Sequence, residues 1–414
     1  MQLTHRRRGG RRESSKLQAL TTSALALGGL AHTAAADTPI DEVFTSYNYS
    51  HYVEDDLDRS KTVPGFPRGR YEIDTQQALL AAPIGDRLDF SLEFMHETMS
   101  GASPWYTVND AAGAPVQVMS GATIEEQRDD AQLSVNYYLD NARIGLSSGY
   151  STENDYDAIS GGFDFETHFN EKNTTLSGGI GLSFDTITPT DSDLDQLRPK
   201  EEDKRTYTLN LGLSQILTRR SLIETSLTYN FGDGYLSDPY KRVYRTDATF
   251  AQDQRPDQRH GFAWLTTFRR HVEELDGTIH LSYQFYYDTW EVSSHTVQFA
   301  WYQNYFDGAL QLMPMVRYYS QSEAKFYVNY LNLNQSRVGD MTSDFRLSSY
   351  GAIGFGLRAQ YEFHTPWLTD IRWGLKASIE RYLSSGDLAL DNPRAENPGL
   401  VSFTVYSLGI TAAF

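Results

Sequence analysis

The strongest constraint on this chain is a two-residue period of apolar side chains. Between Val401 and Phe414, apolar residues alternate with small or polar ones. Successive side chains of a strand point to opposite faces, so this segment would present one apolar and one polar face. A strand with lipid on one side and water on the other has this pattern. We therefore expect the last strand of a bacterial outer-membrane barrel, whose lipid-facing row and assembly signal are Tyr406, Leu408, Ile410 and Phe414.

The same period recurs through the chain, most clearly at Leu88–Met95. About sixteen such segments can be placed, an even number, as in single-chain bacterial barrels. The fold class predicted is all-β: a transmembrane antiparallel up-and-down β-barrel with short periplasmic turns, long extracellular loops and both termini in the periplasm. A soluble β-solenoid or a pair of sandwiches would not explain why short and long connections alternate. The long connections expected include a loop that runs to Gly162 and the segments 97–130, 186–204, 232–260, 321–347 and 384–398.

The first 36 residues have the composition of an export signal. Five arginines and Lys16 precede a short apolar stretch, Leu17–Leu30, and small residues follow at 34–36. The apolar stretch is shorter than the ~20 residues of a membrane-spanning helix. We predict a cleaved signal peptide over 1–36 and a single barrel domain over 37–414.

Charge and cysteine content exclude several classes of function. The chain has 36 basic and 54 acidic residues, of which residues 1–36 hold six and one, so 30 and 53 remain and the formal charge is −23. Binding to nucleic acid needs clustered Lys and Arg, so nucleic acid is not expected as a partner. With no Cys, the chain cannot form disulfides or thiolate metal sites. No cofactor is expected.

Charged residues on the polar side of the alternation define a predicted lumen lining. Rings of carboxylates favour cations in a pore, whereas rows of Arg favour anions, and this mixture leans slightly acidic. The alternative is that these charges only pair with one another across the barrel. The candidate lumen-lining residues are Asp89, Glu93, Arg143, Glu166, Glu224, Asp288, Arg317, Arg358, Glu362, Arg372, Lys376 and Glu380.

Aromatic residues gather where the two membrane interfaces are expected. Tyr287 and Trp290 would lie at the outer rim, and the inner rim would hold Phe306, Tyr361, Phe363, Trp367 and Phe414. Anchoring at the interface is the usual role of such a girdle.

Two acidic loop segments raise the question of Ca²⁺, which takes several oxygen ligands. They are the runs at 54–58 and 191–195, and the second lacks the Gly and closing Glu of a calcium loop. A solvated loop, or one bridged by divalent ions to lipopolysaccharide, is the alternative.

Ser100 and Ser103 lie in a segment bounded by Gly and Pro, but not in a Gly-x-Ser-x-Gly motif, and we identify no catalytic constellation.

The segment 97–105, Glu-Thr-Met-Ser-Gly-Ala-Ser-Pro-Trp, precedes an acidic stretch and the strand at Ala131. It resembles the signature of the bacterial domain-of-unknown-function family 3570. The resemblance implies an outer-membrane barrel, and a role beside an envelope redox system that includes thioredoxin-like and flavinylated proteins. The resemblance implies no functional residues. It identifies the signature loop only as a structural feature, formed by Ser100, Gly101, Ala102, Ser103 and Pro104.

Three functional hypotheses follow. The first is a channel, or a passage or docking barrel, for a small solute, an ion or an envelope redox partner. The second is a barrel enzyme acting on lipid or lipopolysaccharide, and the third is a structural or adhesive barrel that acts through its long loops. In each case outer-membrane lipid, lipopolysaccharide and the barrel-assembly machinery are expected partners.

Overall fold

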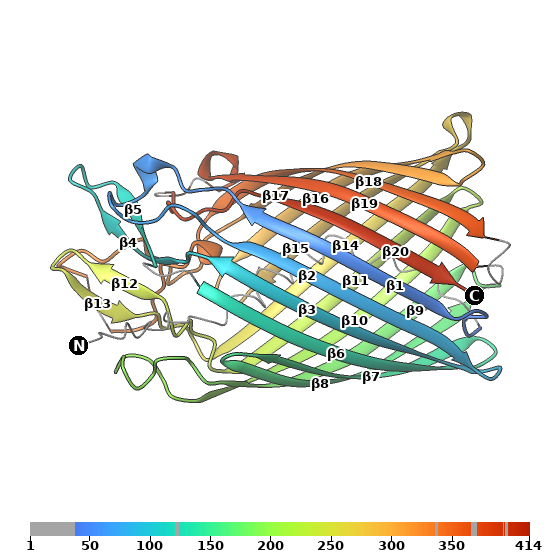
Figure 1. Ribbon diagram of the computed structural model, residues 1–414, viewed down its shortest axis with the longest axis horizontal. Coiled ribbons are helices and arrows are strands. Elements are labelled where there is room, and N and C mark those ends of the chain that lie inside the picture. The colour runs from blue at the N-terminus through green and yellow to red at the C-terminus, as the bar shows by residue number, and fades with distance from the viewer. Residues whose placement is uncertain (1–37, 121–123, 336–337, 366–370, 392, 394–395) are drawn as a thin grey trace, which may run out of the picture.

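The computed structural model describes residues 38–120, 124–335, 338–365, 371–391, 393 and 396–414, so the predicted signal peptide lies outside the described residues. Sixteen antiparallel strands form one closed barrel, in which each strand pairs with its neighbours in chain order and β20 pairs with β1 (Figure 1). The barrel strands are β1 (Phe44–Glu54), β2 (Glu72–Ile84), β3 (Leu88–Gly101), β6 (Ile124–Tyr138), β7 (Ala142–Glu153), β8 (Tyr156–Phe169), β9 (Thr174–Ile187), β10 (Glu202–Thr218), β11 (Ser221–Gly234), β14 (Gln258–Val272), β15 (Gly277–Asp288), β16 (Ser293–Tyr305), β17 (Leu310–Gln321), β18 (Tyr350–Thr365), β19 (Ile371–Ser385) and β20 (Phe403–Ala413).

The two-residue period explains why the sheet closes around a polar lumen. Large apolar side chains of one face are exposed on the outside, among them Leu146 at 61%, Ile159 at 63% and Leu408 at 63%. An exposed apolar surface of this extent suits hydrocarbon, and closure pairs the backbone groups that an open sheet edge would leave free. The predicted antiparallel up-and-down β-barrel is confirmed, including the number of strands.

One end of the barrel carries short turns, and we call it the short-turn end. The β8–β9 turn holds Asn170, Glu171 and Lys172 at positive φ, and the β16–β17 turn holds Phe306 and Asp307 likewise. At this end the backbones of Val43 and Phe414 exchange two hydrogen bonds of 2.9 and 3.0 Å, which extend the β1–β20 seam.

The opposite end, the long-loop end, carries most of the remaining chain. Two hairpins project beyond the barrel there: β4 (Pro104–Asn109) with β5 (Pro115–Met119), and β12 (Arg242–Arg245) with β13 (Thr249–Gln252) (Figure 1). Four short 3₁₀ helices complete the described elements: η1 (Arg59–Lys61), η3 (Phe345–Leu347) and η4 (Gly386–Leu388) in the long loops, and η2 (Glu273–Leu275) in a short turn.

Several expected loops are wrong in detail. The loop predicted to run to Gly162 is mostly strand, because β8 begins at Tyr156 and turns Ile159 outward. Segments 97–130 and 232–260 were expected to be loops throughout, but each holds a hairpin and the ends of barrel strands. These strand ends extend beyond the apolar outer surface of the barrel. Polar residues occur on both of their faces, so the two-residue period cannot be recognised in the sequence.

Most of the aromatic residues expected in the girdle lie on the outside. Tyr287, Tyr361, Phe306 and Phe414 are exposed there, Phe306 at 76%, and Phe363 is half-buried, while Trp367 lies outside the described residues. Trp290 does not lie on the outside: it is 2% exposed and packs against Phe326 in the long loops, with the Arg259 guanidinium 4.2 Å from its ring centroid. For a Trp in a short connection such as this one, the sequence does not indicate whether the side chain packs against the loops or faces outward.

Candidate functional site: the loop cap and the luminal walls

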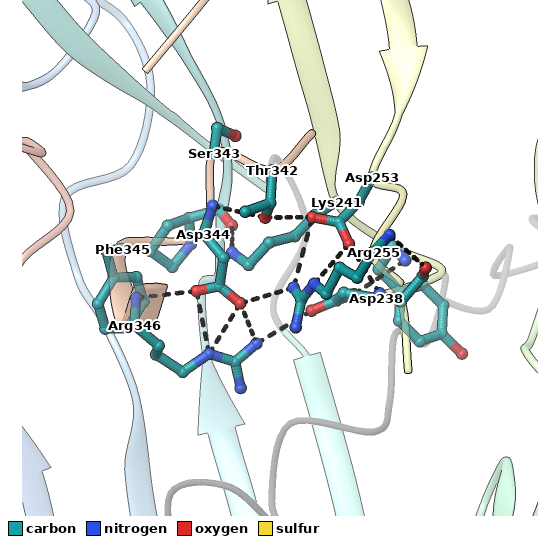
Figure 2. A network of polar contacts seen from close by, with 12 residues as sticks. Asp238, Lys241, Asp253, Arg255, Thr342, Ser343, Asp344, Phe345 and Arg346 are labelled. Atoms are coloured by element: carbon teal, nitrogen blue, oxygen red, sulfur yellow. Dashed lines mark hydrogen bonds and ion pairs between the residues drawn. The ribbon is translucent and has the colours of Figure 1, made fainter. Parts of the chain in front are cut away.

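Buried ion pairs join two long loops at the mouth of the barrel. Residues 235–257 of the β11–β14 loop meet the described residues 322–335 and 338–349 of the β17–β18 loop around the Asp344 carboxylate (Figure 2). Asp344 is fully buried, and it accepts from Arg255 Nη2 at 3.0 Å and from Arg346 Nε at 2.9 Å. We call the long loops together the loop cap.

A second buried carboxylate, Asp253, continues the network. It accepts from Arg255 Nε at 2.8 Å and from the backbone N–H of Asp238 at 2.9 Å, and the Thr342 hydroxyl also donates to it. Arg346 reaches the Asp238 carboxylate at 3.2 Å, so each loop supplies both acids and arginines (Figure 2). Buried charges of this kind persist only when they are paired and hydrogen-bonded.

The two carboxyl groups are shifted in opposite directions. Burial by itself would raise the pKa of Asp344, but Arg346, Lys241 and Arg255 outweigh it and hold this pKa well below its usual range. Burial raises the pKa of Asp253, and Asp238 adds to the rise against the opposing effect of Arg255. The network therefore holds one strongly stabilised carboxylate and one that is costly to ionise.

The ring of Phe345 ties the network to other sides of the barrel. The Arg70 guanidinium lies 5.3 Å and the Lys241 ammonium 5.7 Å from its centroid, within cation–π range. Arg70 in turn forms a buried pair with Glu54 and donates to the Gly399 carbonyl at 3.0 Å. Loops that leave the barrel at four places thus meet at one aromatic residue.

Three further connections, β7–β8, β9–β10 and β19–β20, also contact these two loops. The Tyr240 hydroxyl donates to fully buried Asp155 of the β7–β8 connection, and the Arg198 guanidinium lies 4.6 Å from the Tyr240 ring centroid. Asn397 of the β19–β20 loop donates to the Ser343 carbonyl at 3.2 Å. These contacts join the loops to one another at the long-loop end.

The signature loop Ser100–Pro104 lies at the base of this cap. Gly101 has φ +127°, and a Cβ there would lie 2.1 Å from the Arg70 carbonyl oxygen, so only Gly fits. The Pro104 carbonyl accepts from Lys241 Nζ at 2.9 Å. Ala102 packs with Leu57 and Met119. The motif therefore has a structural role at the point where β3 enters the cap.

Ser100 and Ser103 lie in different environments. Ser100 is exposed on the face of β3 that also carries Leu92 and Phe94, whereas Ser103 is fully buried and its hydroxyl donates to the Pro104 carbonyl. The structure does not bring the two hydroxyls to one site.

The acidic loop segments are engaged by basic side chains. Asp55 pairs with Arg381, Asp193 lies 2.9 Å from Lys200 Nζ, and Asp195 pairs with Arg242. Within the described ranges, no group of three or more His, Asp or Glu is arranged to hold a metal ion.

Nine of the twelve predicted lumen-lining residues form a hydrogen bond or an ion pair with another side chain. Arg143 pairs with Asp164 at 2.7 Å, Glu224 with Arg269 at 2.7 Å and Arg317 with Glu380 at 3.9 Å. The other partnered residues are Asp89 (Tyr138, 2.8 Å), Glu166 (His168, 3.3 Å), Asp288 (Arg259, 2.8 Å), Glu362 (Gln360, 2.8 Å) and Arg372 (Glu42, 3.0 Å).

The other three, Glu93, Arg358 and Lys376, differ. In the part of the chain that the structure describes, they have neither a hydrogen bond nor an ion pair, and each is half-buried. All three alternate with exposed apolar residues on their strands, namely Leu92 and Phe94, Leu357, and Leu375, which places them on the luminal face.

Sorting inward-facing charges by strand divides the lumen into two walls. The acidic wall, β3 with β6–β9, has among its described residues nine carboxylates and two arginines: Asp89, Glu93, Glu97, Glu126, Asp130, Glu153, Asp164, Glu166 and Asp185, with Arg128 and Arg143. The basic wall, β14–β19, has six cationic residues and three carboxylates: Arg259, Arg269, Arg317, Arg358, Arg372 and Lys376, with Asp288, Glu362 and Glu380.

Sequence reasoning missed both arrangements for different reasons. The cap residues lie in loops without a period, so no pattern links residue 253 to residue 344. The separation of the two walls was present in the sequence, but it emerges only when the inward charges are assigned to strands in barrel order.

In the described ranges, no helix is long and apolar enough to cross a membrane.

Comparison with solved structures shows only distant similarity. A bacterial polysaccharide outer-membrane secretin has 9% identity and a TM-score of 0.45, with 89% of this chain and 97% of that chain covered. For OpdQ of Pseudomonas aeruginosa the identity is 10%, the TM-score 0.41 and the coverage 92% and 99%; for a BenF-like porin from Pseudomonas fluorescens Pf-5 they are 12%, 0.43, and 90% and 98%. No functional inference follows from similarities of this size.

The sequence comparisons identify a family without an assigned activity. A search of the curated proteins found no match. The model of one family, described as "Protein of unknown function (DUF3570)", matches residues 17–389, which include the signature loop and fifteen of the sixteen barrel strands. The chain therefore belongs to the DUF3570 family.

Proposed function

We propose that this protein is an integral outer-membrane barrel that passes small polar solutes, and that the loop cap is its closed gate. The long-loop end would face the exterior, and both termini would lie in the periplasm. The observation that carries the proposal is the buried network around Asp344, which joins two loops over the mouth while its residues lie outside the barrel wall.

The energetics of buried charges make such a cap suitable as a gate. A complete buried ion pair contributes little net stability, but removal of one partner costs roughly 3–5 kcal/mol, because it leaves an uncompensated charge. The barrel is held by strand pairing that does not depend on the cap. Local opening of the loops can therefore occur without unfolding the barrel.

The test is single-channel conductance of the purified full-length protein in a planar bilayer, comparing the wild type with Asp344→Ala. We expect a wild type that is mostly closed and a variant with long open states, because Arg255 and Arg346 lose their shared carboxylate. Lys325→Ala is the matched control, since Lys325 lies on the same loop as Asp344 and the substitution removes its exposed pair with Glu291 of the β15–β16 connection, 4.0 Å apart.

Three outcomes are distinguishable. Long openings only in Asp344→Ala support a gated passage. Steady conductance that Asp344→Ala leaves unchanged contradicts the gate but keeps the passage. Silence of both proteins, with normal heat-modifiable mobility to show intact barrels, contradicts the passage itself.

The proposed location in the outer membrane implies lipid, lipopolysaccharide and the barrel-assembly machinery as partners. Lipid would contact the exposed row that includes Leu408, lipopolysaccharide would contact the outer rim, and barrel-assembly machinery would insert the protein. Thioredoxin-like or flavinylated envelope proteins remain partners that only the family resemblance implies, and cross-linking in cells would detect them.

A further inference from the structure

The lumen combines charges of both signs that form neither a hydrogen bond nor an ion pair within the described residues. Glu93 stands on the acidic wall, and Arg358 and Lys376 stand on the basic wall. Most other luminal charges have a hydrogen bond or an ion pair, as Arg143 has with Asp164. A solute in the lumen therefore meets three charged side chains whose donors or acceptors are not already engaged in such a bond.

The hydrogen-bonding register shows how these groups are arranged around the barrel. Starting at Leu310, at the short-turn end of β17, successive partners lead through β18, β19, β20, β1 and β2 to Phe94, in the middle of β3. Rows of partners thus climb toward the long-loop end on the way from the basic wall to the acidic wall, as the strand tilt requires.

This climb brings the unpaired charges to similar heights. The row through Lys376 reaches Met95, and the row through Arg358 reaches Glu97. Glu93 lies two and four residues below these positions on the same face. With strands ~4.8 Å apart and tilted by ~40°, the descent along β3 offsets part of the climb, so Glu93 lies within roughly 10 Å of the level of both cations along the barrel axis.

Resting on the proposed passage, we propose that the lumen selects small zwitterions, solutes such as amino acids that carry one ammonium and one carboxylate group. The ammonium would face Glu93 and the surplus carboxylates of the acidic wall. The carboxylate would face Arg358 and Lys376, where a guanidinium offers two parallel donors to one carboxylate.

The same arrangement disfavours solutes that carry a single charge. A monocation is attracted by the acidic wall but repelled by the basic wall, and a monoanion experiences the reverse. A zwitterion can orient so that both walls attract it, and this attraction offsets part of the hydration that both groups would lose in the lumen.

The test measures solute entry into proteoliposomes that contain the full-length protein, in the wild type and with the gate opened by Asp344→Ala or, as a milder change, Arg346→Gln. The probes are glycine, propylammonium, propionate and uncharged propionamide, which are of similar size. After normalisation to propionamide, we expect glycine to enter about fivefold faster than either ion, which corresponds to roughly 1 kcal/mol.

Substitutions on each wall should shift selectivity in opposite directions. Glu93→Gln should reduce glycine entry and favour propionate, whereas Arg358→Gln combined with Lys376→Gln should favour propylammonium. Lys172→Gln, in the β8–β9 turn, is the control that changes charge away from the luminal walls.

The outcomes separate this inference from the function on which it rests. If propionamide enters but glycine has no advantage, or keeps it in both wall variants, zwitterion selection is wrong and the passage stands. If no probe enters even through the variants with an altered cap, both proposals fail.

Discussion

The loop cap and the lumen manage charge in opposite ways. In the cap, Asp344 and Asp253 are withdrawn from solvent, and each contacts an arginine of the network. In the lumen, Glu93, Arg358 and Lys376 are half-buried and form neither a hydrogen bond nor an ion pair among the described residues. A charge that is buried away from water must be paired, because its desolvation is costly, whereas a charge in a water-filled lumen can remain available to a solute. The difference separates the part of the molecule that closes from the part that would select.

The largest expected effect comes from comparing one arginine of each region. Arg255→Ala would leave Asp253 and Asp344 buried without a shared cation, so we expect the cap to lose about 3–5 kcal/mol. Arg358→Ala removes a luminal arginine without a pair, and we expect less than about 0.5 kcal/mol. Amide hydrogen exchange of residues 338–349 in the intact barrel measures both changes. Equal protection in the two variants would contradict the contrast between cap and lumen.

How far the sequence predicts this molecule depends on whether a segment has a period. The barrel, its strand number and the turn at Asn170–Asn173 follow from alternation and turn residues, because both act locally. The contact between residues 253 and 344 could not be predicted, since it depends on how two irregular loops meet. Tyr156–Gly162 marks the limit between these cases: its small and polar residues were expected to form a loop, yet Ile159 faces lipid and Ser160 the lumen.

A smaller effect is expected from a pair of glycines in the same hairpin region. Gly101 (φ +127°) and Gly113 (φ +85°) both adopt a conformation that disfavours Ala, which costs roughly 1–2 kcal/mol at each. Only Gly101 would also place its Cβ against the Arg70 carbonyl, while Gly113 has open space. We therefore expect Gly101→Ala to lower the thermal stability of the cap clearly more than Gly113→Ala. Equal losses would show that backbone conformation alone explains the signature glycine.

The smallest expected effect, and the one most specific to the network around Asp344, is the dependence of the stability of the cap on pH. An ordinary Asp has a pKa of about 4. The pKa of Asp344 is depressed by Arg346, Lys241 and Arg255, so its contribution is present above about pH 4 and is lost as the pH falls further toward its folded pKa. The pKa of Asp253 is raised, chiefly by burial and by Asp238, so its contribution is present below about pH 4 and is lost as the pH rises through its folded pKa.

These two contributions predict a cap that is most stable near pH 4 and weaker on either side. Because the chain has no Cys, labels introduced by Asp110→Cys and Leu333→Cys can report the distance between two cap loops across this range. Asp253→Asn should abolish the weakening at higher pH, and Asp344→Asn the weakening in acid, each about 1.4 kcal/mol per unit of pKa difference. If both variants kept the wild-type profile, these two carboxyl groups would not control the cap, and its closure would instead depend on the apolar contacts around Trp290 and Val243.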